Sequence, residues 1–183
     1  MPTTPKPRLT HMAIFTYDLE KMVDFYTRVI GLVVSDRGTA SSGKAQMVFM
    51  SSDPHEHHQF VLATGRPDYA SFSIAQQISF LVNSLDELRT MHDRVAAEGM
   101  NITRTVNHGN AWSVYFEDPE RNRIEIYAHT PWHVPQPHAH PFDITLSNEE
   151  IMKQTEAHCR ADPGFMSVAE REKVMAKRLE LVD

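Results

Sequence analysis

The stretch that decides the fold is Asn107 to His129, NHGNAWSVYFEDPERNRIEIYAH. It has the pattern of two strands joined by a tight turn, and the turn is rich in the residues that favour turns, DPERN at 118–122. Glu125 stands between Ile124 and Ile126 in the second strand. A carboxylate flanked in this way lies either on the solvent face of a half-buried sheet or in a site. The hairpin alone leaves both interpretations open, so the rest of the chain has to decide between them.

The order of elements around this hairpin occurs twice along the chain. A strand, a helix that opens at Asp18 and closes at Gly31, and three further strands make the first unit, and a second unit ends in the hairpin. The predicted strands are 9–15, 32–37, 45–51, 57–63, 77–82, 102–106, 111–116 and 123–127, and the second helix runs from Leu85 to Gly99. Each unit leaves one sheet face uncovered, which its twin can cover. The sequence therefore predicts an α+β fold of two tandem β-α-β-β-β modules, residues 8–64 and 74–130, in a curved, mostly antiparallel sheet around a metal cleft.

The two ends of the chain break this pattern. Residues 1–7 are Pro-rich and are predicted to be flexible, and residues 131–183 are predicted to form a Pro-rich connector and C-terminal helices outside the 8–130 domain. The connector is expected to be extended and to cross the surface. Capping-box spacing predicts two helix starts, one from Ser147 with Glu150 and one from Ser167 with Glu170. The predicted apolar faces are Ile151 with Thr155 and Cys159 in the first helix, and Val168 with Met175, Leu179 and Leu181 in the second. These faces need a partner, which we expect to be the cleft mouth or a second subunit.

Composition excludes several function classes. The formal charge of −6, from 18 basic and 24 acidic residues, offers no basic excess for nucleic acid. No apolar run approaches the roughly 18 residues of a membrane span, and the first ten residues lack a signal-type apolar region. We therefore expect no nucleic-acid partner, no membrane segment and a cytoplasmic location. The single Cys159 excludes a disulfide within the chain and is expected to be a packing residue.

The repeat brings candidate metal ligands together. Equivalent strand positions of paired modules converge, which places His11, Gln77 and Glu125 on the cleft side, with His57 or His58 nearby. A histidine, an amide and a carboxylate leave coordination positions open for a substrate. Strand alternation points one of the two adjacent histidines inward without indicating which. Trp112 and Phe80 are expected in the core, and three further histidines are expected at the surface: His133, His138 and His140.

With these residues in place, the chain resembles the vicinal oxygen chelate superfamily of glyoxalases, bleomycin-resistance proteins and extradiol dioxygenases. DPERNRIEIY resembles the family's DP-x-G-N-x-I-E ending, and the resemblance covers residues 8 to 130. It is closest to one-domain type I extradiol ring-cleaving dioxygenases. Four details point there: the His57–His58 pair, His108 in a loop, Tyr115 ten residues ahead of Glu125, and Glu125 itself.

The resemblance implies a role for each of these residues. His11 and Glu125 would be ligands of Fe(II), with Mn(II), Zn or Ni as other possible metals. His58 would be the acid/base, and His108 and Tyr115 would contact the catechol oxygens. Gln77 stands where the dioxygenases have their second ligand histidine, and it is either a metal ligand or a core amide left from a lost site. Arg121 stands where the family turn usually has Gly, which predicts mild strain if the backbone there has positive φ.

The resulting expectation is an extradiol dioxygenase that acts on a catechol-like aromatic with O2, in aromatic catabolism, as a homo-oligomer and most simply a dimer. Two alternatives remain open. A glyoxalase-like isomerase or lyase would use the metal as a Lewis acid and would need no O2. A metal-poor small-molecule-binding protein of the resistance type would have a degenerate site.

Overall fold

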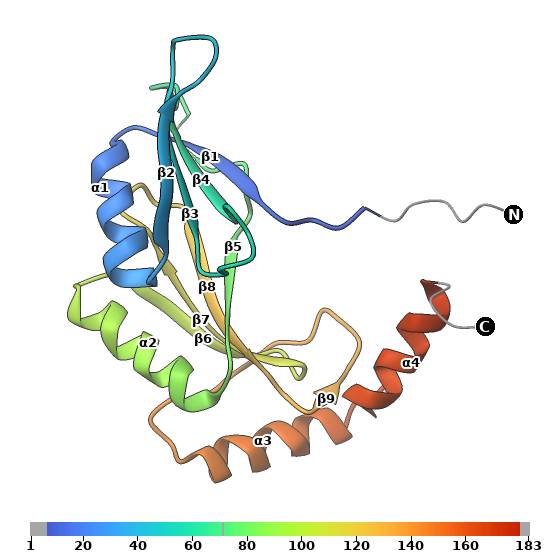
Figure 1. Ribbon diagram of the computed structural model, residues 1–183. Helices are drawn as coiled ribbons and strands as arrows, with labels where there is room; N and C mark the ends of the chain where they lie inside the picture. The colour runs from blue at the N-terminus through green and yellow to red at the C-terminus, as the bar shows by residue number, and fades with distance from the viewer. Residues whose placement is uncertain (1–6, 71, 180–183) are drawn as a thin grey trace, which may run out of the picture. The chain divides into compact units, whose positions relative to one another are not determined.

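The computed structural model describes residues 7–70 and 72–179 and divides into two compact units (Figure 1). The first unit extends to Ser73 and also holds Asp118–Arg121, and the second holds Ile74–Glu117 and the chain from Asn122. The predicted α+β class is confirmed, since each unit carries a β-α-β-β-β module. The predicted domain boundaries, 1–7, 8–130 and 131–183, stay a prediction.

The first unit is a four-stranded sheet with one helical segment. Its strands lie in the order β1-β4-β3-β2, with β1 parallel to β4 and the other pairs antiparallel. The elements are β1 Met12–Thr16, α1 Leu19–Asp24, η1 Phe25–Ile30, β2 Val33–Thr39, β3 Gln46–Ser51 and β4 Phe60–Thr64. Asp18 caps α1 by accepting a hydrogen bond from the Lys21 amide, and Gly31 ends the helical segment with a φ of 94°. The sequence did not predict that the second half of this segment is π-helical.

The turn DPERN fixes the start of α1. Glu120 accepts two backbone hydrogen bonds of 2.8 Å, from the amides of Tyr17 and Asp18, so a carboxylate satisfies donors at the helix start. The Arg66 guanidinium lies 3.5 Å from the same carboxylate, and both side chains are buried. Arg121 has a φ of 66°, so the condition under which mild strain was predicted at this turn is met.

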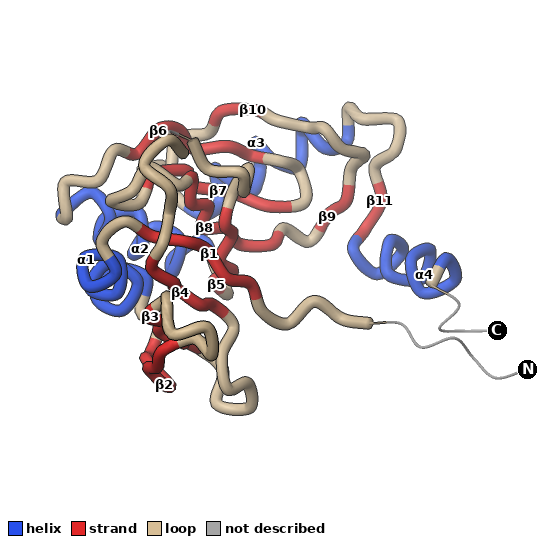
Figure 2. Tube along the Cα trace, turned by 90° about the horizontal axis from the view of Figure 1, so that it is seen from above, coloured by secondary structure: helices blue, strands red, loops and turns tan. Residues whose placement is uncertain are grey.

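The second unit repeats the module and adds the C-terminal chain. Its five-stranded sheet has the order β10-β6-β7-β8-β5, with β5 parallel to β8 and the other pairs antiparallel. The elements are β5 Ile78–Val82, α2 Leu85–Ala97, β6 Ile102–Asn107, β7 Ala111–Glu117, β8 Arg123–His129, β9 Trp132–His133, β10 His140–Pro141, α3 Asn148–Arg160, β11 Met166–Ser167 and α4 Val168–Arg178. Figure 2 shows β9 and β11 side by side, just before α4.

The two modules agree down to an irregularity in one strand pair. The β2–β3 pairing shifts register between Val34 and Asp36, and the β6–β7 pairing shifts between Ile102 and Arg104. As a result Asp36 faces Phe49 in the first module and Arg104 faces Tyr115 in the second. A bulge changes which side chain points to a given face. The repeat therefore holds at the level of cross-strand register as well as element order.

The C-terminal chain corrects two expectations. Both capping boxes are present, but the apolar face of α3 packs on its own unit, since the Trp112 indole donates a 2.8 Å hydrogen bond to Thr155 and Cys159 is fully buried. Trp112 alternates with Tyr115 along β7, so α3 covers the sheet face opposite Tyr115 and does not cover a cleft mouth there. No residue of α4 is buried among those described, and Leu181, which was predicted to belong to its apolar face, lies outside the described residues.

The connector is also less exposed than predicted. Val134 is fully buried, and β9 and β10 each form a short ladder. His133, His138 and His140 are all half-buried, so the expectation that they lie at the surface was wrong. Trp112 is in the core as expected, whereas Phe80 is half-buried. No helix in the described part of the chain combines the length and apolar character needed to cross a bilayer.

Candidate functional site

Glu125 lies at the centre of a hydrogen-bonded cluster in the second unit. Its side chain is buried on the face of β8 that carries Ser79 on one neighbouring strand and Tyr115 on the other. The Tyr115 hydroxyl donates to Oε1 at 2.5 Å, and Ser79 Oγ donates to Oε2, also at 2.5 Å. Burying a carboxylate is costly unless it is paired. Glu125 therefore belongs to a constructed polar site, and the interpretation of a solvent-facing glutamate is excluded.

Gln77 precedes β5 and completes this cluster. Its Nε2 donates to Glu125 Oε2 at 2.6 Å and contacts Ser79 Oγ at 3.0 Å. The amide nitrogen thus holds the carboxylate, which leaves Oε1 of Gln77 as the atom that could bind a metal. The structure brings Gln77 and Glu125 together as predicted. Their roles as metal ligands stay a prediction.

Tyr115 links Glu125 to His108. His108 Nε2 lies 3.0 Å from the Tyr115 hydroxyl, and its Nδ1 lies 2.8 Å from the carbonyl oxygen of His138. A carbonyl can only accept, so Nδ1 carries a proton. The Tyr115 hydroxyl donates to Glu125, so the contact with His108 joins the imidazole, the phenol and the carboxylate in one continuous series of hydrogen bonds.

Burial shifts the acidity of the phenol in this chain. Burial is the main factor that raises the pKa of Tyr115 to about 12, and the hydrogen bond to Glu125 and the negative charge of Glu125 act in the same direction. Tyr115 therefore keeps its proton near neutral pH and serves as a donor. It can orient an oxygen-bearing ligand without becoming a phenolate.

The first unit holds the other predicted side chains. The ring centroids of His11 and His58 lie 4.5 Å apart, whereas His58 and His57 contact each other through Nδ1 atoms at 2.9 Å. Both members of the pair precede β4, so the prediction that they open this strand was wrong by two to three residues. Burial, followed by the neighbouring His11 and His57 rings, lowers the pKa of His58. A neutral imidazole beside His11 is suited to accept a proton.

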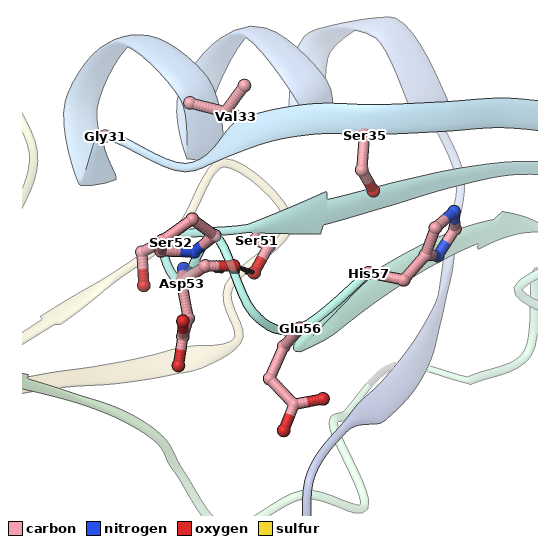
Figure 3. A pocket seen from close by; sticks show the side chains of 9 residues that line it. Gly31, Val33, Ser35, Ser51, Ser52, Asp53, Glu56 and His57 are labelled. Atoms are coloured by element: carbon pink, nitrogen blue, oxygen red, sulfur yellow. Dashed lines mark hydrogen bonds between the residues drawn. The ribbon is translucent and has the colours of Figure 1, made fainter.

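A pocket of about 510 Å³ in the first unit is lined by only one of the two adjacent histidines, His57 (Figure 3). It is lined by Gly31, Val33, Ser35, Ser51, Ser52, Asp53, Pro54, Glu56 and His57. Figure 3 shows His57 and Ser35 on the side of this pocket away from Gly31 and Asp53, with Glu56 between them. His58, the residue that contacts His11, is absent from the lining. His58 is therefore the histidine of the pair that lies beside His11, a distinction that the sequence pattern could not make.

The donor chemistry of the second unit fits a divalent cation. Glu125 Oε1 accepts one hydrogen bond and retains lone-pair capacity, and Gln77, whose Nε2 binds Glu125 Oε2, also carries an amide oxygen. Carboxylate and amide oxygens suit hard divalent metals such as Mn(II) better than softer ones. Across residues 7–70 and 72–179, no group of three His, Cys, Asp or Glu side chains is close enough to hold a metal ion. Gln77 is an amide and is not among those residue types.

Sequence reasoning missed three contributors to this site. Ser79 lies two residues after Gln77 and points to the same side of the sheet. The alternation of side chains along a strand could have predicted this position. Arg104 lies with its guanidinium carbon 4.5 Å from the Tyr115 ring centroid, which only the bulge in β6 makes possible. The His138 carbonyl orients His108 from a connector that was predicted to cross the surface. No local pattern signals either of the last two contacts.

Comparison with known proteins identifies relatives over the same region. The family model described as Glyoxalase/Bleomycin resistance protein/Dioxygenase superfamily matches residues 8–126. Lactoylglutathione lyase of Escherichia coli O157:H7 is 23% identical over 122 residues, which cover 65% of this chain and 90% of the lyase. Biphenyl-2,3-diol 1,2-dioxygenase 3 of Rhodococcus globerulus is 27% identical over 128 residues, which cover 67% of this chain and 64% of the dioxygenase.

Solved structures agree on the fold. A mutant fosfomycin resistance protein from Listeria monocytogenes, in complex with Mn(II) and 1S,2S-dihydroxypropylphosphonic acid, superposes with a TM-score of 0.55 at 17% identity. The superposition covers 69% of this chain and 95% of that protein. At this identity the likeness concerns the fold alone.

Proposed function

Because the chain belongs to the Glyoxalase/Bleomycin resistance protein/Dioxygenase superfamily, we propose that it is a metal-dependent enzyme that cleaves a catechol-like aromatic with O2 in the extradiol manner. The observation that carries this proposal is the chain of hydrogen bonds from His108 through Tyr115 to Glu125. A diol has to lose protons as its oxygens bind a metal and as its ring opens. A histidine that is linked through a phenol to a carboxylate is suited to receive and return them.

The metal would be held by His11, Gln77 and Glu125. Three protein ligands leave positions open for both diol oxygens and for O2. When bound, Fe(II) would supply Lewis acidity and redox chemistry, and Mn(II) is the closest substitute. The first module supports a set of three ligands rather than four. By cross-strand register, Val61 is the residue of the first module that corresponds to Glu125 of the second, and Val61 is apolar and buried. The first module therefore offers no carboxylate at that position.

The protein's own groups would divide the proton transfers. His58, with a lowered pKa, would accept a proton from the substrate. Tyr115, which keeps its proton, would turn its hydroxyl from Glu125 to a diol oxygen once Glu125 binds a metal. His108 would be held in place for the same task by the His138 carbonyl. These roles match those implied by the resemblance to extradiol dioxygenases.

A second candidate is an isomerase or lyase of the lactoylglutathione lyase kind. One observation favours it: the alignment with the Escherichia coli lyase covers 90% of that protein, against 64% of the dioxygenase. The same carboxylate, amide and histidine would then stabilise an enediolate, with no O2 consumed.

One set of assays separates these functions. The purified protein is analysed for metal, loaded anaerobically with Fe(II), and mixed in air with a series of catechols. A yellow ring-fission product is the expected result. Failure to form colour with any catechol, together with formation of S-lactoylglutathione from methylglyoxal and glutathione and with stoichiometric Zn or Ni, would establish the lyase instead. No bound metal and no turnover would indicate a binding protein with a degenerate site.

A further inference from the structure

We propose that Arg104 is an anion-binding residue and that the substrate of this site carries a carboxylate on a short arm. This inference deepens the proposed function and rests on it for the identity of the oxygen-bearing end of the substrate. The anion-binding part concerns the second unit alone, and its evidence is independent of any metal.

The cross-strand register places Arg104 in the same row as the site. Arg104 of β6 faces Tyr115 of β7, Tyr115 faces Glu125 of β8, and Glu125 faces Ser79 of β5. The row crosses four adjacent strands of one sheet (Figure 1). Because neighbouring strands lie about 5 Å apart, the Arg104 backbone is one strand beyond Tyr115 and roughly 10 Å from that of Glu125. A cation thus stands at a fixed short distance from the oxygens of the hydrogen-bonded chain.

A backbone irregularity creates this placement. Ile102 faces Phe116, and regular pairing would bring Thr103 opposite Tyr115. The bulge shifts the register by one residue, and the Thr103 hydroxyl donates a 3.1 Å hydrogen bond to the Tyr115 carbonyl instead. Bulges beside functional sites commonly redirect a side chain. Here the redirected side chain is that of Arg104. Its guanidinium packs on the ring of Tyr115, and the hydroxyl of the same tyrosine contacts Glu125 and His108.

The guanidinium has unused binding capacity. Arg104 is exposed, stacks on the Tyr115 ring at 4.5 Å, and makes no ion pair with a carboxylate among the described residues. Stacking uses the flat face of the group and leaves its in-plane N–H donors free. Those donors match the two oxygens of a carboxylate, which guanidinium binds in a bidentate manner. The stack therefore holds the side chain ready for a planar anion.

These positions define the ligand class. The oxygen-bearing ring would lie against Tyr115 and His108, and the acid group would lie one strand away, beside Arg104. A carboxylate separated from the ring by one or two carbons fits this spacing, whereas an unsubstituted catechol leaves Arg104 without a partner. The site should therefore prefer an acidic diol to its neutral isostere.

The first experiment tests anion binding without any metal or diol chemistry. Phenylacetate and its neutral isostere phenylacetamide are titrated into the full-length protein and followed by protein-observed NMR. The wild type is expected to bind phenylacetate about tenfold more tightly than phenylacetamide, as expected for one charge-assisted contact. Arg104→Gln should abolish this preference and Arg104→Lys should retain part of it. Arg94→Gln, which removes an exposed arginine from α2, should leave the preference unchanged. Equal affinities for the two compounds in the wild type would overturn the anion site.

The second experiment separates this inference from the proposed function. Fe(II)-loaded protein is assayed in air with 3,4-dihydroxyphenylacetate and 3,4-dihydroxyphenylacetamide. The acid should have a kcat/KM at least tenfold higher, and Arg104→Gln should lose that ratio mainly through KM. Turnover of both diols at equal efficiency would overturn the role of Arg104 while leaving the dioxygenase in place. Turnover of neither, with phenylacetate still bound through Arg104, would overturn the dioxygenase and with it the diol end of the proposed ligand, while the anion site would stand.

Discussion

At the scale of single residues, Gln77 determines what the site can bind. Its amide nitrogen holds Glu125 and its oxygen remains available, so the residue supplies a weak neutral donor where an imidazole would bind more strongly. We predict that Gln77→His raises Fe(II) affinity by about tenfold or more, measured by competition with a chelator. Gln76→His, at the exposed neighbouring position, should have no effect. If the two variants bind Fe(II) alike, Gln77 does not face the metal.

Ser79 provides a test of the contacts behind the ligand. It donates to Glu125 Oε2, and groups that orient a metal-binding carboxylate typically contribute ten- to hundredfold to affinity. Ser79→Ala should therefore weaken metal binding by about tenfold while the fold is retained, since Gln77 still donates to the same oxygen. The exposed Ser41→Ala is the matched control. An unchanged affinity in Ser79→Ala would show that Glu125 does not depend on this contact.

At the scale of elements, strand and helix placement followed from the sequence, and the contacts between elements did not. The apolar periodicity of α1 and α2, the capping boxes of α3 and α4 and the hairpin at DPERN are local signals, and all of them predicted the correct element. The bulge in β6 and the burial of Val134 arise from packing between distant segments, which no local pattern contains. Arg104 and the His138 carbonyl were missed for this reason.

The β6–β7 turn is where these long-range contacts concentrate. Gly109 has a φ of 74°, and a Cβ there would lie 2.3 Å from Val134 Cγ2 and 3.3 Å from Cys159 Sγ. Gly109→Ala should therefore destabilise the protein by about 2 kcal/mol or more, through overpacking and backbone strain. Denaturant unfolding measures the change. Gly43→Ala, also at positive φ but with open space around it, should cost less, and equal losses would show that the connector does not press on the turn.

The connector also predicts how stability depends on pH. Burial is the main factor that lowers the pKa of both His133 and His138 below the ordinary value of 6.5. The unfolded chain therefore binds more protons than the folded chain just below pH 6.5. The free energy of unfolding should fall as pH drops from about 7 through the folded-state pKa values.

Denaturant titrations at pH 7 and pH 5 measure this effect. His138→Gln should lose less stability on acidification than the wild type, whereas the exposed His55→Gln should behave like the wild type. If all three proteins lose the same amount, the half-buried connector histidines are not responsible.

At the scale of the whole molecule, the tandem repeat was the most informative feature of the sequence. It predicted the fold, and it explains why Glu125, Ser79 and Tyr115 share one sheet face. It could not predict how Gln77 would orient, because an amide has both a donor and an acceptor end. The metal ligands, the homo-oligomer and the cytoplasmic location stay predictions.

The central claim is that the hydrogen bonds from His108 through Tyr115 to Glu125 belong to the active site of a dioxygenase. Oxygen uptake tests this claim most directly. Fe(II)-loaded wild type, Tyr115→Phe and the exposed control Tyr69→Phe are compared in an oxygen electrode with an acidic diol. We predict one O2 consumed per diol by the wild type, a rate about a hundredfold lower for Tyr115→Phe, and an unchanged rate for Tyr69→Phe. No oxygen uptake by the wild type, or equal rates for all three proteins, would contradict the account.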